Sequence, residues 1–462
     1  MHCGYVVKVE KLRPHANADR LQIATFFGCD TCVGLDVKVG DIGIYFPADL
    51  QLSEQYASVN NLVRKKDDAG NNIGGFLDPD KRNIKAINLR GEKSDGLYMP
   101  IASLGFTGVN TELVGIGNPI SVVNGVEICR KYIPRSNKKY NGALSANRTR
   151  KKKAPIAPLF TEHADTEQLA YNLAAFRSND LVEITLKMHG TSQRTGYLPV
   201  LKGYKRTIWD KILRREGTPI YDWGYVTGTR RTVLENYEGG YYGDNIFREQ
   251  HSKHFEGKLH KGETVYYEVV GFTDNGTPIM GSSNNSKLND KDFIKQYGDT
   301  TVFSYGCDPA GKRVMYGEDE EGTFSIEQTV PQSDMYVYRM TITNEDGDVV
   351  EYTPEFMRYR CEQMGVKCVP VFWRGIIPEN PGTENDDTIS AGEWIFNKAE
   401  TFCDGPDPVG KTHVREGVVV RIINRPKFSA YKHKNFSFKV LEGIIKTNAE
   451  APDMEEVQEI SE

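Results

Sequence analysis

Apolar and polar residues alternate in the stretch LVEITLK, which ends at Lys187. Val182, Ile184 and Leu186 occupy every second position, and this period is typical of a strand that buries one of its faces. Gly190 follows three residues after the lysine and predicts a turn. The pattern therefore predicts a strand that carries Lys187 at its end, directly before a glycine turn.

Residues 1–128 show a different pattern, in which short apolar runs are separated by turn residues. Strands are expected over Tyr5–Leu12, Leu21–Phe27, Asp41–Phe46, Ile84–Arg90, Gly96–Pro100 and Ile120–Ile128. Short, evenly spaced strands with glycine between them are typical of a small closed barrel or a sandwich. We therefore expect an N-terminal β domain.

The rest of the chain predicts longer strands mixed with helices. Helices are expected over Thr166–Phe176, around the apolar residues 247, 255 and 259, and from Thr353 to about Gly365. Strands are expected over Lys261–Phe272, in a hairpin over residues 335–352 that turns at Asp346-Gly347, and over residues 413–422, and the stretch that begins at Phe428 closes the domain. Residues 273 to about 330 predict a polar, glycine-rich insertion of low order. The chain as a whole predicts an α+β fold.

Length and composition limit the classes of protein that this chain can belong to. At 462 residues it has room for two or three domains, and 39% apolar with 26% charged residues is ordinary for a soluble protein. No apolar run is long enough to span a membrane, and the N-terminus lacks a signal-peptide pattern. Eight cysteines are few for this length, so we expect reduced thiols and a cytoplasmic location. Cys29 and Cys32 have the spacing of half a zinc site, but without a second pair they favour a hairpin tip.

Charge is distributed unevenly along the chain. The net charge of −5 argues against a protein that coats nucleic acid indiscriminately. Residues 129–155, however, contain ten Lys or Arg residues and no acidic residue, and their polar composition predicts an interdomain linker. Such a linker either contacts phosphate groups or is merely a soluble connection. Residues 446–462 form an acidic tail that we expect to be disordered.

Lys187 is a candidate nucleophile. An amine must lose its proton before it can attack, and partial burial beside Leu186 and Met188 and near other cations lowers the pKa of a lysine. The same local pattern also fits a surface lysine in front of a turn. The stretch alone leaves both interpretations open.

The N-terminal domain resembles a known nucleic-acid-binding fold. The stretch VVKVEKLRPHANADRLQIATFFG followed by KVGDIGIYFPADLQL resembles the OB-fold domains of tRNA-binding proteins. With IKAINLRGEKSDGLYMPI, it is more similar still to the N-terminal OB domain on one branch of RNA ligases. The resemblance implies an OB-like nucleic-acid-binding domain over residues 1–128, which holds single strands by a cationic groove and aromatic stacking.

Six segments in order along the chain resemble the motifs of covalent nucleotidyltransferases, the superfamily of DNA ligases, RNA ligases and capping enzymes. The matching segments are Lys187-Met-His-Gly190, Thr229-Arg230 with Arg231 as the alternative, Tyr267-Glu268-Val-Val-Gly271, Tyr336-Val-Tyr338, Glu416-Gly-Val-Val-Val-Arg421 and Lys432-His-Lys434. The usual first motif is Lys-x-Asp-Gly, so His189 departs from it and leaves the rate and its pH dependence in doubt. Each motif alone also fits an ordinary strand or a solvated charge cluster.

The resemblance implies a nucleotidyltransferase domain over residues 156–445, built of antiparallel sheets with flanking helices. It implies that Lys187 forms the covalent bond to the nucleotide and that ATP and Mg²⁺ or Mn²⁺ are the cofactors. The nucleotide-binding residues that we expect are Glu183, Thr185, Leu186, His189, Arg230, Arg231, Glu268, Tyr336, Tyr338, Glu416, Lys432 and Lys434. Glu416 and Glu268 are the expected metal ligands. Of the two tyrosines, Tyr338 is favoured to stack on the base.

The function that the resemblance implies is that of an ATP-dependent RNA ligase, which joins a 3′-hydroxyl to a 5′-phosphate through a lysyl-AMP and an RNA-adenylate. Only 28 residues follow Lys434, too few for the C-terminal OB domain of DNA ligases and capping enzymes, so we expect neither of those. The expected partner is broken or nicked RNA, including tRNA, and we expect a monomer in the cytoplasm, or in a host cytoplasm if the protein is phage-encoded. The alternatives are a non-catalytic tRNA- or RNA-binding protein with a degenerate ligase domain, and a DNA ligase or capping-type enzyme.

Overall fold

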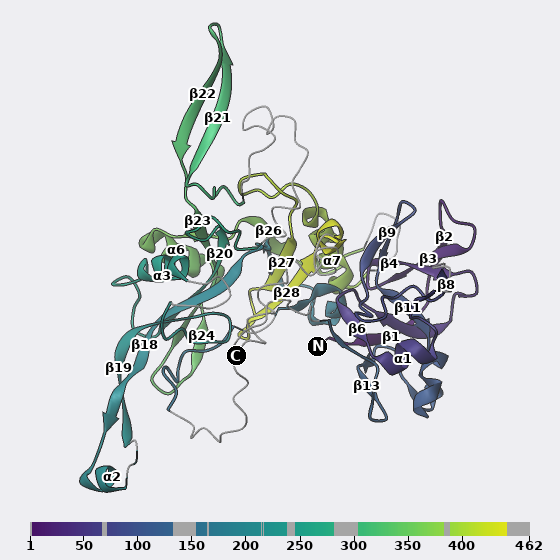
Figure 1. The fold of residues 1–462 in the computed structure, drawn as a ribbon, viewed down its shortest axis with the longest axis horizontal. Helices are drawn as coiled ribbons and strands as arrows, with labels where there is room; N and C mark the ends of the chain where they lie inside the picture. The colour runs from purple at the N-terminus through teal and green to yellow at the C-terminus, as the bar shows by residue number, and fades with distance from the viewer. Residues whose placement is uncertain are drawn as a thin grey trace. The chain divides into compact units, whose positions relative to one another are not determined.

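The computed structural model describes residues 2–66, 72–132, 154–163, 166–213, 217–237, 245–280, 304–382 and 389–440, together with Arg215. The chain forms two compact units (Figure 1). The first unit comprises Met1–Arg135 with Phe436–Pro452, and the second comprises Ser136–Asn435 with Asp453–Glu462. Both contain strands and helices, so the α+β class is confirmed. Among the described residues, no helix is long and apolar enough to cross a membrane.

The first unit is built mainly of short strands. These are β1 Gly4–Lys8, β2 Leu12–Pro14, β3 Leu21–Phe26, β4 Cys29–Gly34, β5 Ile42–Phe46, β6 Leu50–Leu52, β7 Lys65–Lys66, β8 Asn72–Gly74, β9 Ala86–Leu89, β10 Glu92–Asp95, β11 Leu97–Pro100, β12 Pro119–Ile120, β13 Val122–Val123, β14 Val126–Glu127 and β15 Cys129–Lys131. The helical segments are α1 Glu54–Val59, η1 Ile101–Thr107 and η2 Thr111–Leu113. The larger sheets have the strand orders β11-β5-β1-β12 and β2-β3-β4. Within the described residues the strand pairings do not close into one ring, so the predicted closed barrel is not confirmed.

The first unit is longer than its predicted extent of residues 1–128. Strand β15 pairs with β6, and Cys129 and Tyr132 are buried, so the unit continues past its predicted end. Residues 436–440 are helical and also belong to this unit, where Lys439 forms an ion pair with Asp95. Residues 436–440, which were predicted to lie in the second domain, therefore belong to the first unit. Most of the basic linker, residues 133–153, and the acidic tail lie outside the described residues.

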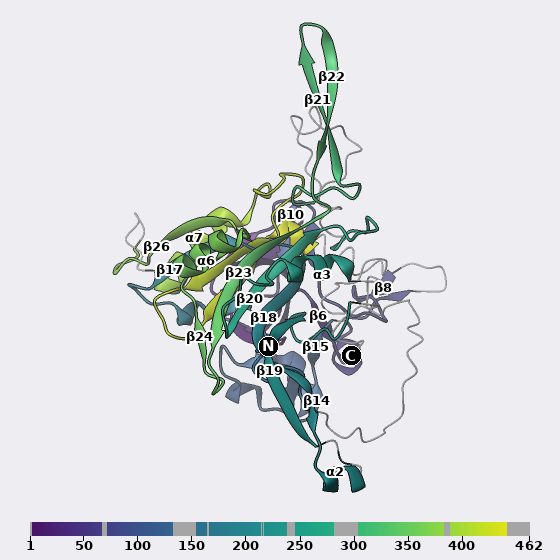
Figure 2. The ribbon, with the colours of Figure 1, turned by 90° about the vertical axis from the view of Figure 1, so that its left-hand side faces the viewer.

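Two large sheets form the body of the second unit (Figure 2). The five-stranded sheet has the order β16-β28-β27-β17-β26, with strands β16 Glu167–Gln168, β17 Leu181–Leu186, β26 Val371–Ile376, β27 Gly417–Ile422 and β28 Ser429–Lys434. The other sheet has the order β19-β18-β20-β23-β24 with β25 beside β23, and its strands are β18 Thr191–Lys205, β19 Thr218–Gly228, β20 Glu263–Gly271, β23 Ser333–Thr343, β24 Val349–Glu351 and β25 Lys367–Cys368. All pairings in these two sheets are antiparallel except β16 with β28 and β23 with β25, so the predicted antiparallel sheets are found.

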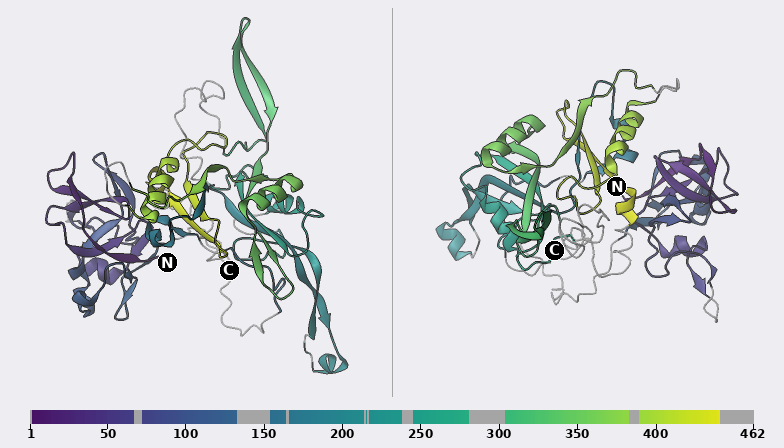
Figure 3. Two further views of the ribbon diagram at one scale, coloured as in Figure 1. Left: turned by 180° about the vertical axis from the view of Figure 1, so that it is seen from behind. Right: turned by 90° about the horizontal axis from the view of Figure 1, so that it is seen from above.

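Helices flank the two sheets. Helices α3 Ile246–Lys253, α6 Pro354–Met364 and α7 Ala391–Cys403 pack against strands of these sheets, whereas α2 Ile208–Ile212 lies at the tip of the β18–β19 hairpin (Figure 1). The predicted helix from Thr353 to Gly365 is confirmed as α6, because the Thr353 side chain accepts the Phe356 N–H at one end and Gly365 adopts φ 68° at the other. Helix α7, which packs against β27 and β28, was not predicted (Figure 3).

Two sequence predictions are wrong in the second unit. Residues 166–176 do not form an α-helix, because Glu167 and Gln168 pair with the edge of β28 as β16 and two 3₁₀ turns follow, η3 Leu169–Tyr171 and η4 Leu173–Ala175. Part of the insertion predicted to have low order is a long hairpin, β21 Lys312–Asp319 and β22 Gly322–Thr329, which projects from the sheets (Figures 1 and 2). Residues 281–303 lie outside the described residues.

Four residues, Lys187 to Gly190, connect the two sheets, since β17 ends at Leu186 and β18 begins at Thr191. The predicted strand and turn are therefore confirmed. A Cβ atom at Gly190 would lie 2.4 Å from the Val269 carbonyl oxygen, so the connection passes too close to β20 for any larger residue.

Candidate active site

Three strand ends meet at Lys187. Because β17 and β27 are antiparallel, Leu186 pairs with Val418, and the end of β17 lies beside the start of β27. Strand β28 pairs with β27 so that its last residue, Lys434, lies opposite Gly417. This topology brings Lys187, Glu416 and Lys434 together although up to 247 positions separate them in the sequence.

Glu416 is the centre of this cluster. Its carboxylate Oε1 lies 2.7 Å from Lys187 Nζ and 3.5 Å from Lys434 Nζ, and its Oε2 lies 3.5 Å from His189 Nδ1. Burial alone would raise the pKa of Glu416, but the adjacent Lys187 and Lys434 ammonium groups, with His189, hold it well below its usual range. The carboxylate is therefore a fixed negative charge among cations.

Gly417 explains how Glu416 can be held so closely. Its φ is 147°, and a Cβ atom there would lie 2.1 Å from the His433 carbonyl oxygen. The Lys187 N–H donates to the Gly417 carbonyl oxygen at 3.0 Å, and the Asn435 N–H donates to the Glu416 carbonyl oxygen at 2.8 Å. The backbone around the carboxylate is thus fixed on both sides.

Lys432 adds a further positive charge to the site. It lies two residues before Lys434 on β28, so the two side chains leave the same face of the strand. Burial lowers the pKa of Lys432 to about 8, and the positive charges of Lys434, Lys187 and Arg230 contribute in the same direction. These contributions place Arg230 within electrostatic range of the lysines.

Arg194 positions the Thr229–Arg231 turn. Its guanidinium is buried and donates to the carbonyl oxygens of Thr229 at 2.9 Å, Arg231 at 3.2 Å and Phe160 at 3.0 Å. The Arg231 side chain is exposed, whereas Arg230 is partly buried. Of the two alternatives, the electrostatic influence on Lys432 therefore favours Arg230 as the residue of the site. No local sequence pattern pointed to Arg194.

Glu268 and the two tyrosines lie on neighbouring strands of the six-stranded sheet. Glu268 on β20 pairs in register with Ser192 on β18 and with Tyr336 on β23. Tyr336 is buried in a cluster with Leu186, Met188 and other apolar residues. Tyr338 is half-buried, its hydroxyl hydrogen-bonds to Ser192 Oγ at 2.9 Å, and the His163 ring contacts it edge-on at 5.1 Å. This difference in burial favours Tyr338 for stacking on a base, which stays a prediction.

Three of the predicted residues make structural contacts. Glu183 is buried and forms a bidentate ion pair with Arg358 of α6, at 2.9 and 3.2 Å. Thr185 Oγ1 donates to the Val419 carbonyl oxygen at 3.4 Å, and Leu186 packs in the apolar cluster beside Tyr336. The recorded contacts of these side chains join elements of the fold, and their contact with a nucleotide stays a prediction.

A group of buried polar residues that the sequence did not reveal lies next to His189. The His189 N–H donates to the Tyr305 hydroxyl at 2.7 Å, and the Tyr305 ring contacts His413 at 4.4 Å between centroids. The Asp407 N–H donates to the His413 carbonyl oxygen at 2.9 Å. Burial raises the pKa of Asp407 to about 7, with Glu416 adding to the effect, and burial lowers the pKa of His413 to about 4. A buried polar layer therefore supports the charged cluster.

The cluster has the features of an anion- and cation-binding site. Lys432, Lys434 and Arg230 supply positive charge for a phosphate group. Glu416 Oε2 makes no hydrogen bond among the described residues, and one such carboxylate, with Glu268 on the facing sheet, suits a hydrated divalent cation. Lys187 is 24% exposed, so its amine can reach a bound molecule.

Comparisons with known proteins identify the fold. No protein-family model and no curated protein matches the sequence. A solved structure of a lysine-to-alanine variant of Naegleria gruberi RNA ligase with ATP and Mn has a TM-score of 0.54 and 14% identity, over 95% of this chain and 98% of that chain. The structure titled Naegleria gruberi RNA ligase with PPi has a TM-score of 0.52 and 15% identity, over 95% of this chain and 98% of that chain. This chain therefore has the fold of that RNA ligase along nearly its whole length.

Proposed function

We propose that this protein is an ATP-dependent RNA ligase, which joins a 3′-hydroxyl end to a 5′-phosphate end through a lysyl-AMP and an RNA-adenylate. The observation that carries the proposal is the contact of Lys187 Nζ with Glu416 Oε1 at 2.7 Å, in a cluster that includes Lys434. The fold of an RNA ligase whose structures contain ATP and Mn supports it. The cluster distinguishes Lys187 from a surface lysine in front of a turn, which was the other interpretation of the sequence pattern.

The first step is attack by the Lys187 amine on the α-phosphorus of ATP. A P–N bond forms, the bond between the α-phosphorus and the oxygen bridging to the β-phosphate breaks, and pyrophosphate leaves. The Lys187 ammonium loses one proton before the attack, its nitrogen loses a second proton once the P–N bond has formed, and both protons pass to solvent. Positioning and charge neutralisation dominate such an in-line displacement. Lys432 and Lys434 supply positive charge beside the nucleophile, and Arg230 supplies a planar fork for phosphate or ribose oxygens.

Glu416 has two roles that exclude each other. In this structure its carboxylate Oε1 contacts the Lys187 Nζ at 2.7 Å, so the nucleophile is turned toward Glu416. Glu416 and Glu268 would hold Mg²⁺ or Mn²⁺, which supplies charge neutralisation for the phosphates. A cation held by Glu416 would compete with this contact and would free the Lys187 side chain to approach the α-phosphorus.

His189 replaces the aspartate of the usual motif without removing the nucleophile. Its backbone N–H is fixed by Tyr305, and its ring nitrogen lies 3.5 Å from Glu416 Oε2. We propose that His189 orients the Glu416 carboxylate by this contact. An aspartate there would instead place a second negative charge next to Glu416.

The second and third steps need RNA. The RNA 5′-phosphate attacks the lysyl-AMP and releases Lys187, and the 3′-hydroxyl of the other end then displaces AMP. We propose that the first unit is OB-like and binds the RNA, together with the basic linker. Lys8, Lys11 and Arg20 have exposed side chains suited to phosphate, whereas Arg13 is engaged by Asp30 and Glu92 at 2.9 and 2.8 Å.

The test is self-adenylation in the absence of RNA. The purified chain is incubated with Mg²⁺ and ATP labelled in either the α- or the γ-phosphate, and it is then separated on a denaturing gel. We expect α-label on the protein, no γ-label, and no label on Lys187→Ala. Absence of α-label from the parent would contradict the enzyme and favour a non-catalytic RNA-binding protein. Replacing ATP with GTP, and nicked RNA with nicked DNA, tests the capping-type and DNA-ligase alternatives.

A further inference from the structure

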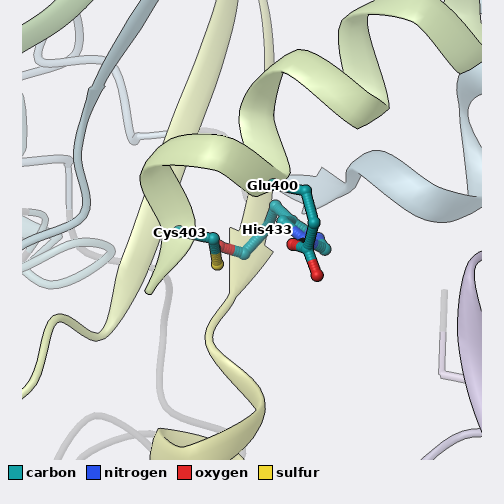
Figure 4. A group of neighbouring side chains, drawn as sticks. All are labelled: Glu400, Cys403 and His433. Atoms are coloured by element: carbon teal, nitrogen blue, oxygen red, sulfur yellow. Dashed lines mark hydrogen bonds and ion pairs between the residues drawn. The ribbon is translucent and has the colours of Figure 1, made fainter. Parts of the chain in front are cut away.

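A second cluster of potential metal ligands lies between α7 and β28, in the same unit (Figure 4). Glu400 and Cys403 come from the last turns of α7, and His433 comes from β28. One ligand atom from each residue lies within 4.8 Å of the others. Glu400 and Cys403 are three positions apart, so they lie on one face of the helix.

The contacts of these three residues show that they already converge. His433 Nε2 lies 2.5 Å from Glu400 Oε2, and Cys403 Sγ lies 3.6 Å from the His433 carbonyl oxygen. Cys403 and His433 are buried, and the Phe396 ring contacts the His433 ring edge-on at 4.8 Å. The Glu400 side chain is 59% exposed, which leaves it room to change rotamer and leaves solvent access to the cluster.

We propose that Glu400, Cys403 and His433 bind one Zn²⁺ ion, with water in the fourth position. A thiolate, an imidazole and a carboxylate are the three ligand types that zinc takes from proteins. Bond lengths of about 2.3 Å to sulfur and 2.0–2.1 Å to nitrogen require these ligand atoms to lie roughly 3.5 Å apart in a tetrahedral site. The three ligand atoms lie within 4.8 Å of one another, so no pair has to approach by more than about 1 Å, and the exposed Glu400 can change rotamer to admit the ion.

Zinc binding replaces the proton of the Cys403 thiol. The S–H bond breaks, an S–Zn bond forms, and the proton passes to solvent. The Glu400 carboxylate exchanges its contact with the His433 ring for a contact with the ion. No oxidant or reductant takes part, because zinc keeps its oxidation state.

The position of His433 on β28 defines the role of this zinc site. Neighbouring residues of a strand point to opposite faces, so His433 faces α7 while Lys432 and Lys434 face the other side of the sheet. The ion would therefore join β28 to α7 from behind the cluster around Glu416. We infer a structural site, separate from the divalent cation proposed for Glu416 and independent of ATP.

The test measures metal directly, so it does not depend on ligase activity. The full chain is stripped with a chelator, loaded with Zn²⁺ or with Co²⁺ as a spectroscopic probe, passed through a desalting column and assayed for bound metal. We expect one Zn²⁺ per chain and a thiolate-to-cobalt charge-transfer band. Cys403→Ser should abolish the band, and Cys129→Ser should retain it. Cys129 is the matched control because it is also buried and donates its thiol to a backbone carbonyl oxygen, that of Ile120 at 3.2 Å.

A second variant keeps the proposal open to contradiction if Cys403→Ser does not fold. Glu400→Gln changes an exposed side chain, so the variant should fold. It should weaken zinc binding by at least about tenfold, since mutation of a residue that only hydrogen-bonds to a metal ligand already lowers metal affinity by about 10–100-fold. Equal zinc retention by the parent and Glu400→Gln would overturn the proposal. Failure of the parent to hold zinc above the level of Cys403→Ser would overturn it as well, and would leave an ordinary Glu400–His433 ion pair.

Discussion

Replacing Glu416 by glutamine removes the charge at the centre of the site and keeps the side-chain volume. In the parent, Coulomb's law with an effective dielectric constant of about 20 gives about 6 kcal/mol for the Lys187–Glu416 contact at 2.7 Å, before screening by solvent reduces it. The substitution also removes the negative charge that suits a divalent cation. Loss of one well-placed electrostatic group costs about 10²–10³ in rate, or roughly 2.7–4 kcal/mol of barrier. We therefore expect Glu416→Gln to slow lysyl-AMP formation by about 10²–10³.

The assay is a single-turnover time course of α-label transfer from ATP to the protein, normalised to the folded fraction. Glu263→Gln is the matched control, because Glu263 is also a buried carboxylate, paired with Arg360 at 2.8 Å and bonded by Tyr352 at 2.9 Å. That variant should lower the melting temperature but keep the rate per folded molecule. Transfer by Glu416→Gln within about threefold of the parent would refute the reasoning, as would equal rate losses in both variants.

Four further predictions follow from the same contacts. Asp407→Asn should stabilise the protein at pH 8 by at most about 4 kcal/mol and have little effect at pH 4. The pKa of Asp407 is about 7 in the folded protein and about 3.9 in the unfolded chain, so the parent loses stability as the pH rises between these two values. Equal effects of the substitution in denaturant melts at both pH values would contradict this. Tyr338→Ala should raise the KM for ATP at least tenfold whereas Tyr338→Phe should not, because stacking needs the ring and not the hydroxyl. Equal KM values for the parent and Tyr338→Ala, measured by titrating ATP in the adenylation assay, would exclude Tyr338 as the residue that stacks on the base. His189→Asp should slow adenylation because its charge repels Glu416, and His189→Asn is the uncharged control. Faster adenylation by His189→Asp than by the parent would contradict the proposed role of His189 in orienting Glu416. Arg20→Glu should reduce sealing of nicked RNA, increasingly so at lower salt, while self-adenylation remains, and equal losses in both assays would show a structural role.

The charged cluster was predictable because its members belong to short motifs whose order along the chain is informative. Lys187, Glu416 and Lys434 are placed together by antiparallel pairing of β17, β27 and β28, and a pattern of alternating apolar residues already marks such strands. The glycines at 190 and 417 are also part of those motifs. The structure explains them by close backbone approach, which the sequence alone did not show.

Other features depended on tertiary contacts that leave no local pattern. Arg194 holds the Thr229–Arg231 turn through backbone carbonyl oxygens, and any residue type can supply those. Tyr305 and Asp407 approach the site from loops with no recognisable spacing. Strand β4 was not predicted, because the turn that precedes it places Phe27 at φ 51°. Phenylalanine rarely adopts a positive φ, so the sequence does not indicate a turn there. Residues 166–176 were predicted as a helix because propensity carries no information about the open edge of β28.

The central claim is that the side chain of Lys187 carries adenylate. The most direct measurement is peptide mapping by mass spectrometry after incubation of the parent with ATP and Mg²⁺ and removal of free nucleotide. The account predicts one added AMP on the peptide that contains Lys187, with fragment ions that place it on that residue and none on Lys432 or Lys434. Adenylate on either of those lysines, or on no lysine, would contradict it.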